Sequence, residues 1–199
     1  HLNKQMHGIS PEDIIRRILG LSERPIETTN FRPYAASLLH ACQYELPNIK
    51  VIWCDTGYNT RQTYRHAAEL SRLLKLNLKI YTPRHTTAYL DSYYGGIPEV
   101  TDPRHSEFTR QVKLEPFERA MKEHRPDVWF TNLRQGQTTF RDSIGILSYS
   151  RDGILKISPF YYWSEERLEK YLKEHQLPNE FSYYDPTKAL EHRECGLHG

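Results

Sequence analysis

Short apolar runs alternate along the chain with segments in which apolar residues recur every three or four positions. The clearest apolar run is Lys50–Cys54 (KVIWC), which is bounded by polar residues and is typical of a buried parallel strand. The clearest periodic segment starts at Ser10, where a capping serine, a proline and two acidic residues precede isoleucines at helical spacing. Because strands and helices alternate, the pattern predicts an α/β domain built on a mostly parallel, twisted sheet flanked by helices.

The same pattern predicts the other main elements. We expect strands near Pro25–Asn30, Leu78–Tyr81 and Asp127–Asn132, helices near Pro33–Tyr44, Gln62–Leu74, Glu115–His124 and Ser164–His175, and an exposed loop at Tyr94–Ser106. In parallel sheets, ligands bind beyond the carboxyl ends of the strands. The loops that directly follow the predicted strands are therefore where a site is expected.

Three of these loops suit an anionic nucleotide. The first, Thr28–Pro33, combines hydroxyls, an amide and an arginine at a helix start, which suits a phosphate, although its polar side chains can equally form a plain helix cap. The second, Asp55–Thr60, has a glycine that permits a close turn and an aspartate that can accept from a ribose hydroxyl or an adenine amine, or it is an ordinary turn. The third, Leu133–Ser143, has two arginines, whose forks match phosphate or sulfate oxygens; a solvated basic loop is the alternative.

Composition narrows the class of protein. The chain of 199 residues fits one domain, with 26% charged and 38% hydrophobic residues, and its net charge of +2 is too small to indicate nucleic-acid binding. No apolar run reaches membrane-spanning length, and the N-terminal stretch HLNKQMHGIS lacks the apolar core of a signal peptide. Three widely spaced cysteines favour free thiols in a reducing compartment, so a cytoplasmic protein is expected.

Several common cofactor motifs are missing from the sequence. There is no G-x-x-x-x-G-K-S/T, no G-x-G-x-x-G and no C-x-x-C. His192, Cys195 and His198 are too closely spaced to form one tetrahedral metal site without other ligands. We therefore expect no metal site.

The C-terminal segment Lys188–Gly199 (KALEHRECGLHG) holds Cys195 among charged residues and glycines. A thiol in such a segment is poorly placed for a core and well placed to reach a ligand or another protein. Cys42 and Cys54 instead fall in predicted core elements and are expected to be packing residues.

Taken in order, these motifs resemble the phosphoadenylyl-sulfate (PAPS) reductase family, the assimilatory sulfonucleotide reductases. The resemblance runs from about Thr28 to the end of the chain. Its motifs are D-T-G-Y at Asp55–Tyr58 followed by Thr63 and Tyr64 (with Gln62 in place of a glutamate), Lys75–Lys79, Lys113–Pro116, the arginine loop L-R-x-x-Q-x-x-x-R at Leu133–Arg141, and E-C-G-L/I-H at Glu194–His198.

The resemblance implies an adenine-nucleotide α-hydrolase-like fold and usually a homodimer, with a nucleotide-binding domain over residues 1–187 and a mobile catalytic tail over residues 188–199. It implies that Cys195 attacks the sulfur of the activated sulfate and becomes S-sulfocysteine, from which thioredoxin or glutaredoxin releases sulfite. The positive neighbours of the tail, such as His198, can favour the thiolate. The residues expected in the site are Cys195 and His198 for catalysis and Thr28, Thr29, Asn30, Phe31, Arg32, Asp55, Thr56, Gly57, Tyr58, Lys113, Arg134, Gln137, Arg141 and Arg193 for substrate binding.

The sequence also departs from the family pattern. The iron–sulfur branch carries a paired Cys-Cys and a later C-x-x-C, which this chain lacks, so the cluster-free branch and its usual substrate PAPS are favoured. The first loop usually reads S-S-S-F-G, whereas here Arg32 stands in place of the glycine, and the segment before the tail is shorter than usual. Adenylyl sulfate therefore stays open as the substrate. An ATP pyrophosphatase is disfavoured because no S-G-G-x-D-S loop is present, and a non-catalytic nucleotide sensor is disfavoured by the intact tail motif.

Overall fold

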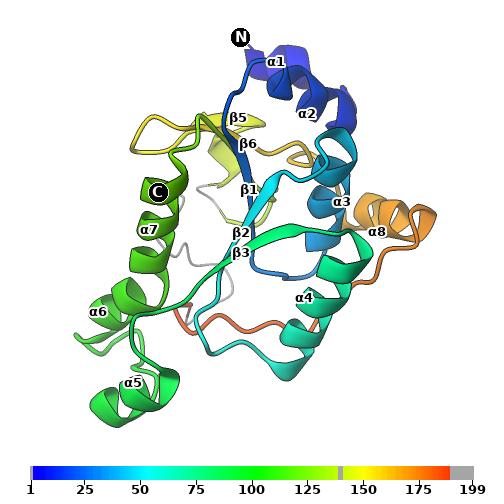
Figure 1. The fold of residues 1–199 in the computed structure, drawn as a ribbon. Helices are drawn as coiled ribbons and strands as arrows, with labels where there is room; N and C mark the ends of the chain where they lie inside the picture. The colour runs from blue at the N-terminus through cyan, green and yellow to red at the C-terminus, as the bar shows by residue number, and fades with distance from the viewer. Residues whose placement is uncertain (1, 139–140, 189–199) are drawn as a thin grey trace.

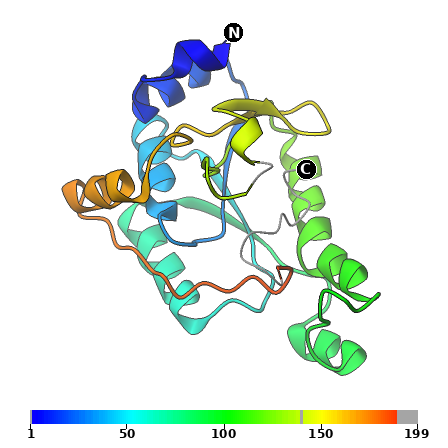
Figure 2. The same cartoon turned by 180° about the vertical axis from the view of Figure 1, so that it is seen from behind.

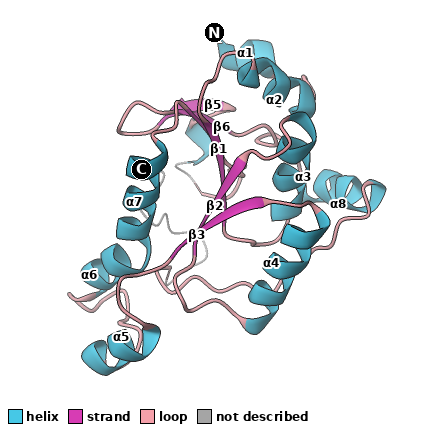
Figure 3. Ribbon diagram, viewed as in Figure 1, coloured by secondary structure: helices cyan, strands magenta, loops and turns pink. Residues whose placement is uncertain are grey.

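Six strands form one sheet in a computed structural model that describes residues 2–138 and 141–188 (Figures 1 and 3). The strand order is β3-β2-β1-β4-β6-β5; the first five in this order run parallel, and β5 runs antiparallel to β6. This confirms the expected mostly parallel sheet. The strands are β1 Pro25–Thr29, β2 Lys50–Cys54, β3 Asn77–Tyr81, β4 Val128–Phe130, β5 Leu147–Tyr149 and β6 Leu155–Ile157.

Helices cover both faces of the sheet. In Figure 1, α3, α4 and α8 lie on one side and α7 on the other, while α5 and α6 project beyond the sheet. None of the described helices has both the length and the apolar character needed to cross a membrane. The helices are α1 Leu2–Met6, α2 Pro11–Leu19, α3 Ala35–Glu45, α4 Arg61–Leu73, α5 Thr87–Tyr94, α6 His105–Thr109, α7 Glu115–His124 and α8 Glu165–Glu174, with a π-helical turn η1 at Arg110–Leu114 and a 3-10 turn η2 at Arg141–Ser143.

Strand alternation builds a separate core on each face of the sheet. Ile26, Ile52 and Trp129 point to the face covered by α7 and are buried there. Val51 and Phe130 point to the opposite face and pack in the larger core beneath α2, α3, α4 and α8. Because neighbouring residues of a strand face opposite ways, the residue after Ile26 in β1, a glutamate, faces the larger core.

Several predicted elements are confirmed in detail. The strand Lys50–Cys54 and the helix Glu115–His124 have the expected bounds. Ser10 and Ser164 are the N-caps of α2 and α8, and each side chain accepts a backbone N–H three residues on, as helix-capping serines do.

Other predictions need correction. The segment Tyr94–Ser106 is only partly an exposed loop, because Tyr94 ends α5 and is buried against Phe108 of α6, with ring centroids 5.6 Å apart. Helix α3 starts at Ala35 rather than at the preceding proline, because Tyr34 has a left-handed backbone (φ +66°). The short strands β5 and β6 have three residues each and were not expected, since so few residues show no clear period.

The described chain ends in a strap, which we define as residues 177–188. It leaves α8 and runs along the carboxyl ends of β1 and β2 (Figure 2). The carbonyl of Ser182 accepts from the hydroxyl of Thr60 at 2.9 Å, at the start of α4. Asn30, in the loop after β1, donates to the hydroxyl of Tyr183 at 2.8 Å. The strap thereby joins the two loops that follow β1 and β2.

Candidate functional site

A pocket lies at the carboxyl ends of β1 and β4. Four cationic side chains from different elements line it, together with hydroxyls and amides of the loops after the two strands and apolar side chains of the sheet. The lining residues that matter most below are Glu27, Thr28, Thr29, Asn30, Arg32, Cys54, Lys113, Asn132, Arg141, Asp185 and Lys188. This is the sheet edge at which parallel α/β folds bind ligands.

The loop after β1 is stabilised by its own polar side chains. Thr29 Oγ1 accepts from the backbone N–H of Phe31 at 3.1 Å, and Asn30 Oδ1 accepts from that of Arg32 at 3.3 Å. The alternative of a plain helix cap is wrong, because the N-cap of α3 is Tyr34, and its side chain makes no cap hydrogen bond. The ring of Phe31 is fully buried in the core, so only its backbone lies along the loop.

Thr28 has a different role from its neighbours in the first loop. Its hydroxyl accepts from Trp129 Nε1 at 2.8 Å, so it joins β1 to β4 at the pocket wall. Trp129 was not among the expected site residues, because an apolar run such as DVWFTN indicates only a buried strand.

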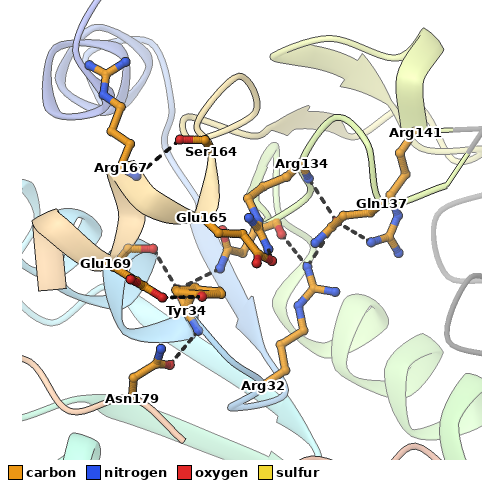
Figure 4. Close-up of polar contacts among 12 residues, drawn as sticks. Arg32, Tyr34, Arg134, Gln137, Arg141, Ser164, Glu165, Arg167, Glu169 and Asn179 are labelled. Carbon is orange, nitrogen blue, oxygen red and sulfur yellow. Dashed lines mark hydrogen bonds and ion pairs between the residues drawn. The ribbon is translucent and has the colours of Figure 1, made fainter. Parts of the chain in front are cut away.

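The side-chain oxygen of Gln137 is shared by three donors (Figure 4). Arg141 Nη1 donates to it at 2.5 Å and Arg32 Nη2 at 3.3 Å, and the backbone N–H of Arg134 donates at 3.1 Å. Arg32 Nη2 also donates to the carbonyl of Asn132 at 2.6 Å. The first and third predicted loops are thereby joined by side chains 105 positions apart in sequence.

The guanidinium of Arg134 points away from the pocket. It lies 5.2 Å from the ring centroid of Tyr34 and 3.3 Å from Glu165 Oε1, against the first turn of α8 (Figure 4). Arg134 is not among the residues that line the pocket. In this structure, Arg134 therefore contributes its backbone to the arginine loop, and its side chain ties that loop to α8.

Lys113 reaches the pocket from the π-helical turn η1 and forms a buried ion pair with Asp185 of the strap. Asp185 also accepts from the hydroxyl of Thr187 at 2.6 Å and from its backbone N–H at 3.0 Å. Burial alone would raise the pKa of Asp185, but the charge of Lys113 and these hydrogen bonds together bring it below the usual range. Sequence reasoning missed Asp185, because its partner lies 72 positions away.

The second predicted loop, after β2, is not part of this pocket. Asp55 Oδ1 accepts from the backbone N–H of Gly57 at 2.9 Å, from Asn59 Nδ2 at 2.8 Å and from the hydroxyl of Tyr64 at 2.9 Å. Burial and this hydrogen bond raise the pKa of Tyr64 to about 12. None of the predicted residues Asp55, Thr56, Gly57 and Tyr58 lines the pocket formed by the other two loops.

Glu27 is a pocket residue that the sequence did not reveal. It is fully buried in the middle of β1, on the face toward α3, and burial raises the pKa of its carboxyl well above the usual range. Burial therefore disfavours the charged form of the Glu27 carboxyl in the pocket. Burial likewise raises the pKa of Cys42 well above its usual value and that of Cys54 to about 12, so both are protonated thiols rather than thiolates.

The predicted residues Arg193, Cys195 and His198 lie outside the described residues. The described chain ends at Lys188, which itself lines the pocket, so the tail joins the chain at the pocket. Among residues 2–138 and 141–188, no group of histidine, cysteine and acidic side chains is arranged to hold a metal ion.

Solved structures share this fold. A PAPS reductase from Candida auris matches with a TM-score of 0.78 and 23% identity, over 90% of this chain and 86% of that one. An NH3-dependent NAD synthetase from Campylobacter jejuni matches with a TM-score of 0.58 and 12% identity, over 90% of this chain and 74% of that one. At these identities the likeness concerns the fold alone, which is adenine-nucleotide α-hydrolase-like, as the motifs implied.

Sequence comparison gives the family. A phosphoadenosine 5'-phosphosulfate reductase from Xylella fastidiosa strain 9a5c is 35% identical over 89% of this chain and 75% of its own length. The relative from strain M23 is 36% identical over 78% of this chain, which covers 65% of that protein, and one from Cronobacter sakazakii is 31% identical over 98% and 89%. The model of the phosphoadenosine phosphosulfate reductase domain matches residues 27–184. This chain therefore belongs to the phosphoadenosine phosphosulfate reductase family, a family of oxidoreductases.

Proposed function

We propose that this protein is a thiol-dependent reductase of PAPS, and that Cys195 is its nucleophile. The observation that carries the proposal is the cationic pocket at the carboxyl edge of the sheet, from which the tail departs at Lys188. Cys195 lies seven positions after Lys188. A chain of that length spans at most about 25 Å, so Cys195 is within reach of a nucleotide in the pocket.

The charge of the pocket suits this reaction. Attack by a thiolate on an activated sulfate brings two negative groups together, so fixed cations are needed to offset their repulsion and to stabilise the departing phosphate. Arg32, Arg141 and Lys188 supply positive charge at the pocket wall, and Lys113 adds a fourth cation that Asp185 holds in place. Burial raises the pKa of Glu27, the other acidic lining residue, well above its usual range, which disfavours a negative charge there.

In the first step, the Cys195 thiolate attacks the sulfur of the sulfate group of PAPS. A bond forms between the two sulfur atoms, and the bond from that sulfur to the bridging phosphate oxygen breaks. Adenosine 3',5'-bisphosphate leaves with the electron pair of the broken bond, and Cys195 remains as S-sulfocysteine. This is nucleophilic catalysis through a covalent intermediate.

In the second step, a thiolate of thioredoxin or glutaredoxin attacks Sγ of Cys195. The sulfur–sulfur bond to the sulfonate breaks, and sulfite leaves with its electron pair. The second thiol of the reductant then closes its own disulfide and frees the Cys195 thiolate. The dithiol loses two electrons, and the sulfur of the sulfonate group gains them as sulfite.

Intact mass after incubation with PAPS tests the proposal. The wild-type protein is expected to gain about 80 Da, the mass of one sulfonate, and to lose it when reduced thioredoxin is added, because covalent capture marks nucleophilic catalysis. Cys195→Ser is expected to gain no mass and to release no sulfite. Cys54→Ser is the matched control, because Cys54 is the cysteine of the described residues that lines the pocket, and the variant should still form the adduct.

Other results of this experiment would change the assigned nucleophile, the substrate or the activity itself. An adduct that persists in Cys195→Ser, or undiminished sulfite release by that variant, would overturn the assignment of the nucleophile. An adduct with adenylyl sulfate at a rate equal to that with PAPS would make adenylyl sulfate an equal substrate. Nucleotide binding with no adduct from either compound would favour a binding protein without reductase activity.

A further inference from the structure

Gln137 offers a single oxygen to donors from three parts of the chain. Arg32 comes from the loop after β1, Arg141 from the turn η2, and the third donor is the backbone of Arg134. All three partners are donors, which fixes the orientation of the amide: the oxygen must face them, because an NH2 group has nothing to accept.

Gln137 lies behind the pocket rather than in its wall. Arg32 and Arg141 are among the lining residues, and Gln137 is not. Arg32 is fixed a second time by the carbonyl of Asn132, a lining residue at the end of β4. Neutral oxygens of residues 132 and 137 therefore help to hold both guanidinium groups at the pocket wall.

The neutrality of these oxygens affects the pocket. A carboxylate in place of the amide would bind two guanidinium groups more strongly, because charge-assisted hydrogen bonds are the stronger kind. It would also cancel one positive charge directly beside the site where an anion binds. An amide accepts in the same geometry and adds no negative charge of its own beside the two arginines.

We propose that Gln137 is a positioning residue that sets Arg32 and Arg141 as a paired guanidinium clamp for the phosphate groups of a nucleotide. Arg32, which stands where the family usually has glycine, makes this clamp favour the more highly charged nucleotide. The electrostatic energy of a fixed cation scales with the charge of its ligand, so Arg32 contributes more to a nucleoside bisphosphate than to a monophosphate. The inference rests on the nucleotide site of the proposed function and not on the reaction of Cys195.

Calorimetric binding of adenosine 3',5'-bisphosphate and of AMP tests the clamp without any turnover. For Gln137→Glu we expect a midpoint of thermal unfolding equal to or above that of the wild type, together with about a tenfold loss of affinity for the bisphosphate. Gln137→Ala should lower both the midpoint and the affinity. A purely structural role of Gln137 predicts the opposite for the glutamate variant, because a better acceptor would preserve the loop and the binding alike.

Arg32→Gly tests whether Arg32 makes the clamp favour the more highly charged nucleotide. Its affinity for the bisphosphate should fall more than its affinity for AMP, so that the ratio of the two drops by about three- to tenfold. Glu165→Gln is the matched control: Glu165 lies beside the same loop but outside the pocket lining, and both affinities should stay within about twofold of the wild type.

The outcomes separate this inference from the function on which it rests. Wild-type affinity in Gln137→Glu, or an unchanged ratio in Arg32→Gly, would overturn the clamp while leaving the reductase proposal standing. A wild-type protein that binds neither nucleotide would overturn both. A Gln137→Glu protein that does not fold would contradict the expected midpoint and so overturn the positioning role, and the ratio in Arg32→Gly would still decide the role of that arginine.

Discussion

The loops that follow β1 and β2 are neighbours at the same edge of the sheet, yet their charged side chains have opposite signs and different roles. After β1, the cation of Arg32 is held by neutral acceptors, the carbonyl of Asn132 and the amide oxygen of Gln137. After β2, the anion of Asp55 is held by neutral donors, which include the N–H of Gly57 and the hydroxyl of Tyr64. The first loop presents positive charge to a pocket, whereas the second uses negative charge to fix its own shape.

The two loops also differ in where their partners lie. All three donors to Asp55 lie within nine positions of it along the chain. Arg32 instead depends on residues 100 and 105 positions away. A local loop can form its contacts before the sheet is complete, while the arginine clamp exists only once β1 and β4 are paired.

The largest effect on stability is expected at the pocket, from Lys113→Met. The substitution removes the partner of a buried carboxylate and leaves Asp185 without its cation. Breaking a buried ion pair on one side costs about 3–5 kcal/mol, because the remaining charge stays desolvated. Chemical denaturation of the variant should show a loss of this size, larger than that of any substitution in the loop after β2.

A double substitution and the pH dependence of stability both test the ion pair between Lys113 and Asp185. Lys113→Met combined with Asp185→Asn should recover part of the loss, because no uncompensated charge then remains. The pKa of Asp185 is lowered in the folded protein, so its stabilising contribution is present above the unfolded pKa of about 4 and is lost as the pH falls through the folded value. Asp185→Asn should therefore flatten the acid side of the stability curve, and an unchanged acid limb would contradict this account.

Asp55→Ala is expected to have the next largest effect. It removes an acceptor shared by three donors, and hydrogen bonds to a charged group stabilise by about 1.5–3 kcal/mol, so a loss of about 2–3 kcal/mol is expected. Asp55→Asn keeps one acceptor oxygen and should lose less. The affinity for adenosine 3',5'-bisphosphate should change by less than about tenfold, since this loop does not line the pocket. A larger loss of affinity would place Asp55 in the nucleotide site, as the sequence predicted, and would remove the contrast between the two loops.

The fold followed from the sequence wherever the signal was local. The run KVIWC and the serine caps of α2 and α8 gave elements at the expected positions, because strand burial and helix capping depend on neighbouring residues. The elements that the sequence did not predict depend on tertiary contacts. Helix α5 becomes part of a small separate core through Tyr94 and Phe108, and β5 and β6 are too short for a period to show.

The candidate site was predictable in its residue types and not in its arrangement. Arg32 and Arg141 were expected in one site, and the structure brings them to the same pocket. Arg134 was expected there as well, but its side chain reaches Glu165, a contact that depends on how α8 packs against the loop. Glu27 and Asp185 gave no motif, since their role comes from burial and from a partner far along the chain.

Gly57→Ala should have a smaller effect than Asp55→Ala. Gly57 has a φ of +81°, and a Cβ there would lie 2.6 Å from Thr87 Cγ2 at the start of α5. We expect the strained backbone and this contact together to cost about 1–2 kcal/mol, in the lower part of the range for residues held in sparsely populated conformations. Combining it with Thr87→Ser removes the methyl group but not the strained backbone, so about half of the loss should return. Full recovery of stability in the double variant would show that the contact with Thr87 alone destabilises Gly57→Ala. No recovery would show that the left-handed backbone at residue 57 alone does so.

Glu165→Gln should have the smallest effect. Only one partner of its ion pair with Arg134 is buried: the side chain of Arg134 is 10% exposed, whereas that of Glu165 is 68% exposed. Ion pairs with a solvated partner contribute about 0–1 kcal/mol, and Arg134 keeps its position over the ring of Tyr34 when the charge of Glu165 is removed. We therefore expect less than about 1 kcal/mol of change in the free energy of unfolding, measured by denaturation at low and at high salt. A loss above 2 kcal/mol that does not diminish in high salt would mean that Arg134 needs this carboxylate, and that the arginine loop depends on an ion pair with α8 as well as on the neutral oxygen of Gln137.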